Sequence, residues 1–437
     1  MSRELFGTDG VRGLANEYPL NEDGATRIGR AIGTYFAKPG ETIVLGRDPR
    51  QSSDDIAAWV TAGLNAVGVN VVSAGVLPTP GLAYSTREGD FAAGVMITAS
   101  HNPYNYNGVK AFDKNGDKLP DTTEETLNEL IEQDIPDVDT PGDVREDVEL
   151  VKKYEDFLVS TVEGLQISDL KLAIDSANGA ASGIAERVMS RLGAEVTAMF
   201  DSPDGININD HCGAIDTKAL QKEVTEKHLS LGIALDGDAD RLVMVDGEGR
   251  EVNGDHIMYI LAVSRNVEGV VSTTMSNLGL ENSLTAKGIK LIRTSVGDRY
   301  VLHGLQSHGY RLGGEQSGHL IIYDVLRTGD ALLGAVQVLK ALQESGKSLA
   351  QWRDEVQLLP QALINIPLDD KNLLQDPKVL AYVEEQTAKL GDSGRLLIRP
   401  SGTEPLARIM VEAPDAEAII QEIVDGLNMA LGEAKNG

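Results

Sequence analysis

Residues 42–76 read TIVLGRDPRQSSDDIAAWVTAGLNAVGVNVVSAGV, and their pattern of apolar residues predicts the fold class. It begins with TIVLG (42–46), an apolar run as long as a typical buried strand. Apolar residues then recur at helical spacing over 53–68, and NVVSAGV (70–76) is a second strand-like run. A strand, a helix and a strand in this order predict parallel pairing through a crossover helix, and hence an α/β sheet.

The same alternation continues and then restarts twice. A helix opened by Pro80 and the run FAAGVMITA (91–99) complete a βαβαβ unit, with helices expected on both faces of the sheet. Two further units follow at 170–237 and 269–316. The C-terminal part differs, because two strand-like runs at 395–413 lie between two helices. We therefore expect an α/β protein with three consecutive, related α/β domains of mainly parallel mixed sheets, followed by a small C-terminal α+β domain.

Polar segments rich in Pro, Asp and Gly indicate where these domains meet. They lie at 133–147, 246–255 and 359–370. The predicted domains are residues 1–148, 149–252, 253–363 and 364–437.

The composition limits the compartment and the partners. The formal net charge of −28 argues against nucleic acid or an anionic membrane as the main partner. No apolar stretch reaches the about 18 residues of a membrane span, and the first residues lack the apolar core of a signal peptide. Cys212 is the only cysteine, which excludes an intrachain disulfide. We expect a cytoplasmic protein, monomeric or homodimeric, whose small anionic ligands would need local cationic side chains.

The first candidate loop, SHNPYNYNGVK (100–110), follows an apolar strand. Ser100 would be held at the strand end, where ligands of open α/β sheets bind. His101 is its neighbour, but adjacent side chains of an extended backbone diverge, so a direct Ser–His pair is not expected. From these residues alone, Ser100 is equally well interpreted as a helix cap, a turn residue or a nucleophile.

The second loop, DGDADR (236–241), follows the apolar run LGIAL. An EF-hand is excluded, because its sixth loop position would be Arg241 and its twelfth Gly247 instead of Gly and Glu. Three carboxylates at alternate positions predict a hard oxygen site suited to Mg²⁺. Arg241 adds a cation for a phosphate group. A solvated acidic turn is the alternative.

Two further loops offer groups for a sugar and a phosphate. GGEQSGH (313–319) presents Glu315, Ser317 and His319, which suit sugar hydroxyls, although a plain hairpin turn has the same composition. RPSGTEP (399–405) combines a guanidinium with hydroxyls and backbone N–H groups around a glycine, which is typical of an anion site. Its candidate residues are Arg399, Ser401, Gly402 and Thr403. Arg12 and Lys110 are further cations beside these loops.

These loops, in this order, resemble those of the α-D-phosphohexomutase superfamily over essentially the whole chain. The shared motifs are GTDGVRG (7–13), TASHNP (98–103), NGVK (107–110), DGDADR, VGDRYV (296–301), GGEQSGH and RPSGTEP. Gln316 and VGDRYV are similar to the glucosamine branch of the superfamily. The resemblance implies four domains around a central cleft. It also implies interconversion of glucosamine 6-phosphate and glucosamine 1-phosphate, which supplies UDP-N-acetylglucosamine synthesis.

The same resemblance implies a role for each candidate residue. Ser100 would carry a covalent phosphate, and glucosamine 1,6-bisphosphate would be the intermediate and primer. One Mg²⁺ per chain would be bound by Asp236, Asp238, Asp240 and phosphorylated Ser100. Glu315 and Ser317 would contact sugar hydroxyls, and the 399–403 loop would hold the phosphate that is not reacting. The remaining candidates would line or order the reacting centre: Arg12, Lys110, Arg241 and His319, with Lys110 and His319 as candidate acid/base groups, and His101 and Asn102 as loop-orienting residues.

Three other interpretations stay open at this point. A phosphomannomutase or phosphoglucomutase would use the same chemistry on another sugar. A phosphatase would use Asp236 as its nucleophile, which leaves the other three loops without a role. A non-catalytic sensor would bind sugar phosphates without exchanging isomers.

Overall fold

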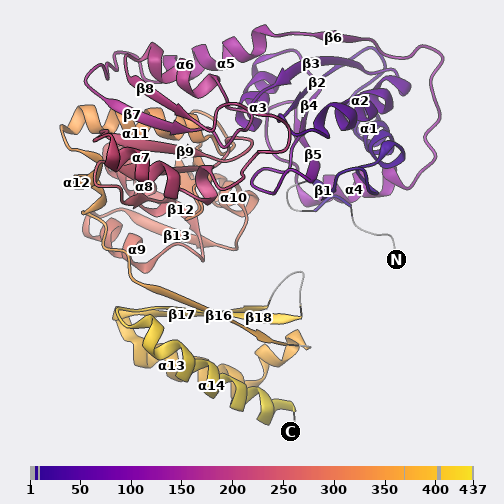
Figure 1. The fold of residues 1–437 in the computed structure, drawn as a ribbon. Coiled ribbons are helices and arrows are strands. Elements are labelled where there is room, and N and C mark those ends of the chain that lie inside the picture. Colours follow the sequence, from indigo (N-terminus) through magenta and orange to yellow (C-terminus); the bar gives the residue numbers. More distant parts are fainter. Residues whose placement is uncertain (1–4, 8–9, 369, 401–404, 436–437) are drawn as a thin grey trace. The chain divides into compact units, whose positions relative to one another are not determined.

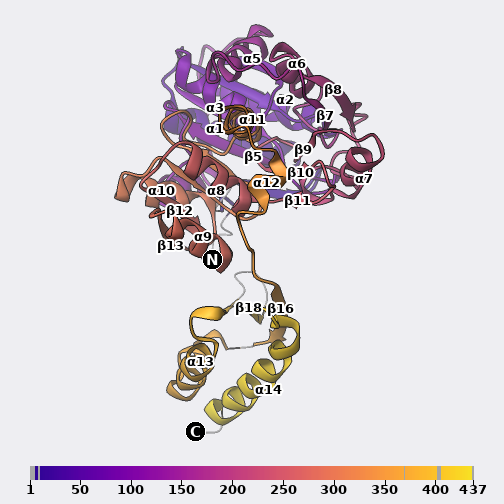
Figure 2. The same ribbon diagram turned by 90° about the vertical axis from the view of Figure 1, so that its left-hand side faces the viewer.

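The computed structural model describes the chain except for residues 1–4, 8–9, 369, 401–404 and 436–437. The chain divides into two compact units, shown in two views in Figures 1 and 2. The large unit comprises Met1–Met275 and Lys287–Glu355, and the small unit comprises Ser276–Ala286 and Val356–Gly437. Among the described helices, none combines the length and apolar character that crossing a membrane would require.

The first sheet contains six strands in the order β1-β5-β4-β2-β3-β6. Its strands are β1 (Val11–Leu14), β2 (Thr42–Arg47), β3 (Asn70–Val76), β4 (Ala93–Ile97), β5 (Tyr106–Asp113) and β6 (Val144–Glu146). β4, β2, β3 and β6 are parallel, whereas β5 and β1 pair antiparallel at the other edge. The predicted βαβαβ unit is confirmed. Residues 106–110 were expected in a loop, and this expectation is wrong because they begin β5.

Different helices pack against the two faces of this sheet. The helices near it are α1 (Glu22–Phe36), α2 (Ser53–Ala66), α3 (Thr79–Glu88), α4 (Asp121–Ile131) and α5 (Glu149–Ser160). Ile43 and Leu45 share a core with Ile28 of α1 and Ile56 of α2. Gly46 points to the other face, because successive strand residues alternate, and there it lies against Leu82 of α3. The sheet is therefore covered on both sides, and its strand ends emerge from a rigid core.

Two more sheets complete the large unit. The second has the order β11-β10-β9-β7-β8 and the third the order β13-β12-β14-β15, both with parallel pairs and an antiparallel edge. Their strands are β7 (Lys171–Asp175), β8 (Glu195–Met199), β9 (Leu231–Leu235), β10 (Leu242–Asp246), β11 (Glu251–Val252), β12 (Gly269–Thr273), β13 (Lys290–Thr294), β14 (Leu312–Gly314) and β15 (Leu320–Ile322). The helices that accompany them are α6 (Ile184–Arg191), η1 (Gly213–Ile215), α7 (Lys218–Glu226), α8 (Gly254–Ser264), α10 (Asp298–His308), α11 (Ala331–Ser345) and α12 (Leu349–Arg353).

The small unit is an antiparallel sheet, β16-β18-β17, with two long helices. Its elements are α9 (Leu278–Ala286), β16 (Gln361–Pro367), η2 (Lys371–Gln375), α13 (Pro377–Leu390), η3 (Gly391–Ser393), β17 (Arg395–Pro400), β18 (Leu406–Glu412) and α14 (Ala416–Lys435). The two predicted strand-like runs are β17 and β18. β16 was not predicted, because its segment resembled a linker. The expected class, three α/β sheets followed by a small α+β domain, is confirmed.

Candidate active site

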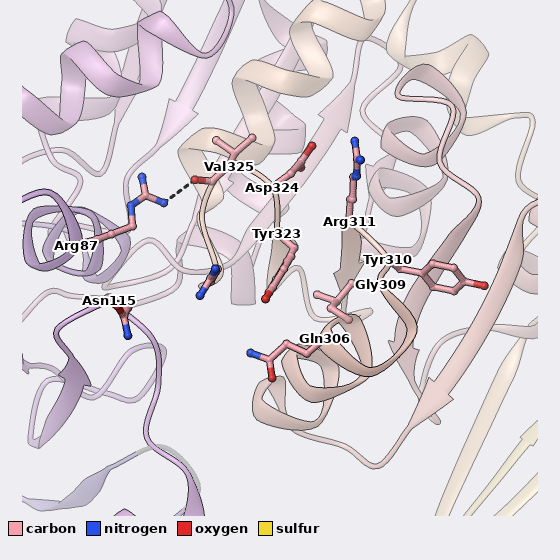
Figure 3. A pocket seen from close by; sticks show the side chains of 11 residues that line it. Arg87, Asn115, Gln306, Gly309, Tyr310, Arg311, Tyr323, Asp324 and Val325 are labelled. Carbon is pink, nitrogen blue, oxygen red and sulfur yellow. Dashed lines mark hydrogen bonds between the residues drawn. The ribbon is translucent and has the colours of Figure 1, made fainter.

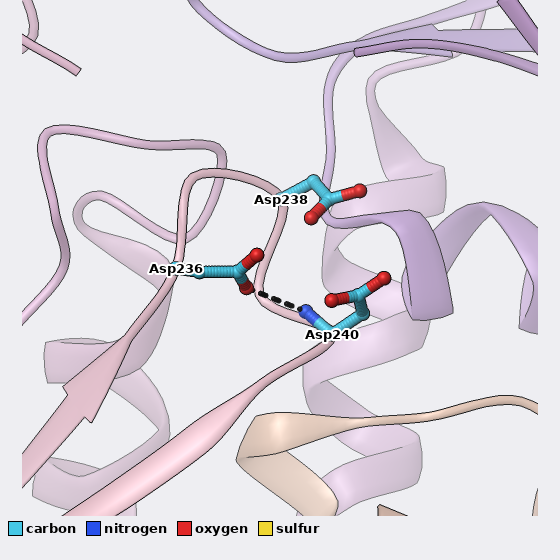
Figure 4. Close-up of side chains that lie close together, drawn as sticks. All are labelled: Asp236, Asp238 and Asp240. Carbon is cyan, nitrogen blue, oxygen red and sulfur yellow. Dashed lines mark hydrogen bonds between the residues drawn. The ribbon is translucent and has the colours of Figure 1, made fainter. Parts of the chain in front are cut away.

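The acidic loop 236–241 connects β9 to β10 at the carboxyl end of β9. All five residues of β9 are buried, so the loop starts inside the large unit. Ala239 has a φ of 58°, a left-handed conformation that turns the loop back on itself. Asp236, Asp238 and Asp240 thereby point to one place, with a ligand oxygen of each within 4.8 Å of the others (Figure 4). The folded chain thus gathers the three predicted carboxylates.

The oxygens of this cluster fit a divalent cation. Oδ1 of Asp238 and Oδ1 of Asp240 are buried and accept no hydrogen bond from any residue that the structure describes. Burial, with Asp240 and Asp238 nearby, raises the pKa of Asp236 well above its ordinary value. Burial alone would also raise the pKa of Asp240, but the charges of Lys110, His319 and Arg241 outweigh it and lower that pKa. Such a buried, all-oxygen cluster matches the ligand preference of Mg²⁺.

Ser100 reaches this cluster from the end of β4. Its side chain is buried, and its Oγ donates a 2.7 Å hydrogen bond to Oδ2 of Asp236. Ser100 has a φ of 50°, which is unfavourable for a non-glycine residue by about 1–3 kcal/mol. The left-handed turn brings Oγ within 3.3 Å of Nδ1 of His101. The expectation that the two side chains diverge is therefore wrong, because it assumed an extended backbone.

Two buried side chains hold the Ser100 backbone in this conformation. Nη2 of Arg50 donates hydrogen bonds of 2.8 Å to the carbonyls of Ser100 and Asn102. Nδ2 of Asn209 donates to the Ser100 carbonyl at 2.9 Å. Arg50 is itself neutralised by Asp48 at 2.8 Å, with both side chains fully buried. Sequence reasoning missed Arg50 and Asn209. A signal for Arg50 was available, since it follows β2 at the same carboxyl edge of the sheet as Ser100.

Lys110 lies in strand β5, next to the acidic cluster. Its side chain is 4% exposed, and Nζ lies 3.1 Å from Oδ2 of Asp238 and 3.6 Å from Oδ2 of Asp240. Oγ1 of Thr79 donates a 2.7 Å hydrogen bond to the same Asp238 oxygen. Lys110 therefore lies against two of the three carboxylates, and its charge lowers the pKa of Asp240.

The other predicted cations and loop residues surround Ser100. Nη1 of Arg12, on β1, donates to Oδ1 of Asn102 at 2.9 Å. Burial opposes the charge of Arg241, but Asp240 and Asp236 outweigh burial and raise its pKa. Burial and the charges of Arg241 and Arg12 lower the pKa of His101 to about 4. His101 is therefore neutral at physiological pH, which fits a hydrogen-bonding residue better than a cation.

The glycine-rich loop 313–319 is a hairpin turn between β14 and β15, as the alternative interpretation had it. It nevertheless lies beside the acidic loop, because the backbones of His319 and Arg241 pair as a β-bridge. Oε1 of Glu315 accepts a 3.1 Å hydrogen bond from Gly297 N, and Ser317 is exposed. The His319 side chain is 5% exposed, with Nε2 3.4 Å from Oδ2 of Asp298.

The phosphate-loop candidates belong to the small unit. Arg399 lies in β17 and is half-buried, and its pKa is lowered first by burial and then by the charge of Arg408. Ser401, Gly402 and Thr403 lie outside the described residues.

Comparisons with known proteins match the same family along the whole chain. Four models of one family match it in chain order: "Phosphoglucomutase/phosphomannomutase, alpha/beta/alpha domain I" at residues 3–136, domain II at 151–249, domain III at 253–359 and the "C-terminal domain" at 363–427. The chain is 46% identical to a protein named phosphoglucosamine mutase 2 from Shewanella amazonensis, over 95% of this chain and 96% of that one. It is 44% identical to a phosphoglucosamine mutase from Thermus thermophilus, over 99% of each.

Solved structures share the fold. A phosphoglucomutase/phosphomannomutase family protein from Burkholderia thailandensis has a TM-score of 0.84 at 24% identity, covering 99% of this chain and 98% of that chain. The N-acetylphosphoglucosamine mutase of Aspergillus fumigatus, solved with GlcNAc-6P and magnesium, has a TM-score of 0.69 at 17% identity, covering 98% of this chain and 96% of that chain. With four consecutive family domains matched and full-length relatives above 40% identity, this chain belongs to the phosphoglucomutase/phosphomannomutase family, as its motifs predicted.

Proposed function

We propose that this protein interconverts glucosamine 6-phosphate and glucosamine 1-phosphate, with Ser100 as the phosphoryl carrier. The observation that carries the proposal is the 2.7 Å hydrogen bond from Ser100 Oγ to Asp236, within a carboxylate cluster that has unsatisfied buried oxygens. The names of relatives at 44–46% identity supply the amino sugar. We further infer that the enzyme is cytoplasmic and is a monomer or homodimer.

The reaction proceeds in two phosphoryl transfers. Phosphorylated Ser100 gives its phosphoryl group to the free 1- or 6-hydroxyl of the sugar, so the Ser100 O–P bond breaks, a sugar O–P bond forms and the hydroxyl proton passes to a base. This yields glucosamine 1,6-bisphosphate and Ser100, whose oxygen takes up a proton. Ser100 Oγ then attacks the other phosphate and loses its proton, the sugar O–P bond at that phosphate breaks, and the freed sugar oxygen takes up a proton, which regenerates the phosphorylated enzyme and releases the isomer. Asp236, Asp238 and Asp240, together with the phosphate on Ser100, would hold Mg²⁺, which would supply positive charge that stabilises phosphoryl transfer.

Cationic side chains of the protein also stabilise negative charge at the reacting centre. Arg241 and Arg12 lie near His101, since the charges of both lower its pKa, and can neutralise oxygens of the transferring group. Lys110 and His319 are the acid/base candidates, because both are buried and the charge of each lowers the pKa of Asp240. His101 and Asn102 orient the serine loop through Ser100 Oγ and Arg12.

The two transfers require the sugar to be held in two orientations. Glu315 and Ser317 would bind its hydroxyls from the hairpin turn, and the loop with Arg399, Ser401, Gly402 and Thr403 would hold the distal phosphate. In this proposal residues 1–148 supply the phosphoserine, and residues 149–252 supply the metal-binding loop 236–241. Residues 253–363 supply the turn 313–319 for the sugar, and residues 364–437 supply the loop 399–403 for the distal phosphate.

The direct test replaces the carrier. We expect purified Ser100→Ala to lose isomerisation by about a thousandfold or more, because a catalytic nucleophile has no substitute. Ser182→Ala, which removes a serine hydroxyl elsewhere in the large unit, should keep normal turnover. Mass spectrometry should locate phosphate on Ser100 of the active protein. Near-normal turnover of Ser100→Ala, or trapped phosphate on Asp236 instead, would contradict the proposal.

A second assay tests the sugar. Initial rates with glucosamine 1-phosphate, glucose 1-phosphate and mannose 1-phosphate should rank the amino sugar first by kcat/KM. Faster turnover of glucose or mannose phosphate would assign the enzyme to another branch of the family. Binding of all three without isomer exchange would leave only a sensor.

A further inference from the structure

The large unit contains a cavity that is separate from the Ser100 site. Its volume is about 740 Å³, in the range of small-molecule sites. Arg87 contributes from α3 and Asn115 from the turn after β5, and the other lining residues lie between Leu305 and Arg327 (Figure 3). Ser100, the three aspartates and Lys110 do not line it.

Its position on the third sheet explains this separation. Arg311 directly precedes β14 and Tyr323 directly follows β15, so both lie at the open end of the hairpin. Glu315 and Ser317 lie in the turn at the other end. The cavity and the turn with Glu315 and Ser317 therefore occupy opposite ends of the same pair of strands.

The lining is positively charged although the chain is strongly acidic. Three arginines, Arg87, Arg311 and Arg327, face one carboxylate, Asp324, which gives a formal charge of +2. Asp324 is itself neutralised, since Nη2 of Arg265 donates to its two oxygens at 2.9 and 3.0 Å. Arg87 and Arg327 are paired with Glu88 and Asp117, which lie outside the lining, so Arg311 is the arginine whose charge no described carboxylate offsets, and it favours an anionic ligand.

The three guanidinium groups keep donors for such a ligand. The Arg311 side chain makes no hydrogen bond or ion pair with any described residue. Arg87 uses Nε on Glu88 at 2.7 Å and Nη1 on the Val325 carbonyl at 2.8 Å. Arg327 uses Nη1 on Asp117 at 3.1 Å. Since a guanidinium carries five N–H donors, most donors of each group remain for planar oxyanions.

One feature opposes an anion, and its magnitude is small. The C-terminal end of α10 borders the cavity at Leu305 and Gly309, and a helix C-terminus carries about half a negative charge. The Leu305 carbonyl already accepts the N–H group of Gly309 and, at 3.2 Å, that of Tyr310. The unpaired charge of Arg311 and the remaining guanidinium donors of Arg87 and Arg327 therefore outweigh this small effect.

The arrangement of the arginines indicates the size of the anion. Arg87 and Arg311 extend from opposite sides of the cavity, with Tyr323 between them (Figure 3). The guanidinium of Arg327 lies 5.2 Å from the centroid of the Tyr323 ring. A single phosphate group cannot fill a cavity of about 740 Å³. We propose that the cavity binds a small molecule with a diphosphate group, whose two phosphates contact arginines from the two sides.

The test is calorimetric titration of the full chain with inorganic pyrophosphate, in excess glucosamine 6-phosphate so that the Ser100 site is occupied. We expect one bound pyrophosphate per chain. Arg311→Gln should weaken it about tenfold, the value of one charge-assisted hydrogen bond. Gln306→Glu, which adds a negative charge to the lining, should weaken it as well. Arg145→Gln, an exposed arginine of β6, should bind as the unmodified chain does.

Isomerase turnover separates this proposal from the proposed function, because Arg311→Gln should keep normal kcat and KM. A nucleoside diphosphate titrated in parallel identifies the source: tighter binding than pyrophosphate indicates an organic ester, and weaker binding indicates the inorganic ion. Absence of binding, its complete displacement by the sugar phosphate, or equal affinity in all variants would overturn the proposal.

Discussion

Ser100 and Asp236 are 136 positions apart in the chain, yet the serine hydroxyl donates a 2.7 Å hydrogen bond to the aspartate. Each residue follows the carboxyl end of a central strand, β4 in the first sheet and β9 in the second. The contact therefore joins the candidate phosphoryl carrier to the candidate metal ligands. Substitutions around this contact should therefore change stability, metal binding and turnover, all of which can be measured.

Mg²⁺ should stabilise the fold. Three buried carboxylates repel one another, and a cation bound only by the folded state adds about 2.7 kcal/mol at a concentration of 100 Kd. We expect Mg²⁺ to raise the thermal midpoint of the apo protein in scanning fluorimetry, and EDTA to reverse the change and abolish turnover. Asp238→Asn should lose most of the shift. An equal Mg²⁺ shift in Asp238→Asn would show that the ion binds elsewhere.

Lys110→Met should separate metal binding from catalysis. The lysine ammonium competes with a cation for Asp238 and Asp240, at 3.1 and 3.6 Å. Without it, Mg²⁺ affinity should rise, whereas turnover should fall about a hundredfold or more if Lys110 transfers the proton. Titration of Mg²⁺ against activity and against thermal midpoint measures both. Lys114→Met, at an exposed lysine in the turn after β5, is the matched control. A fall in both affinity and turnover would indicate a purely structural lysine.

Arg50→Lys should destabilise the serine loop. A lysine cannot replace the hydrogen bonds from one guanidinium to Asp48 and to the carbonyls of Ser100 and Asn102. Breaking such a buried network costs about 3–5 kcal/mol. Urea unfolding should show this loss, and the fraction of folded protein that carries phosphate should fall. Arg47→Lys, whose partner Asp54 is exposed, should change stability by about 1 kcal/mol or less. Equal effects of both variants would contradict a specific role of Arg50.

Asp330 should make stability depend on pH. Burial raises its pKa from 3.8 to about 7 in the folded state. Between these values the folded chain holds a proton that the unfolded chain releases, so this residue's contribution falls as pH rises from about 4 to about 7. The change is on the order of 4 kcal/mol. Asp330→Asn keeps the helix cap on Leu333 and removes the titration. Its thermal midpoint relative to the unmodified chain should therefore increase over this range.

Tyr154 provides a companion measurement. Its hydroxyl donates to both Asp330 oxygens at 3.0 Å, which lowers the Asp330 pKa against the larger effect of burial. Tyr154→Phe should move the pH midpoint of the stability change upward. A constant difference between Asp330→Asn and the unmodified chain at pH 4.5 and 7.5 would refute the assignment.

Elements with a strong local pattern could be predicted from the amino-acid sequence alone. The apolar run of β9 and the helical spacing of α2 depend on burial of contiguous side chains, so their periodicity is visible without a structure. The same holds for the acidic loop, because a buried strand directly before 236–241 locates three carboxylates at its end. The family resemblance also depends on such short contiguous motifs.

Features that depend on partners far away in the chain could not be predicted and are visible only in the folded protein. Lys110 belongs to β5, although its polar surroundings resemble a loop, because β4 and β1 pair with it on both sides. Ser100 adopts a left-handed backbone because Arg50 and Asn209 hold its carbonyl. β16 is a strand because β18 pairs with it. Periodicity reports which residues are buried locally, whereas these conformations are stabilised by hydrogen bonds between segments that meet only when the chain folds.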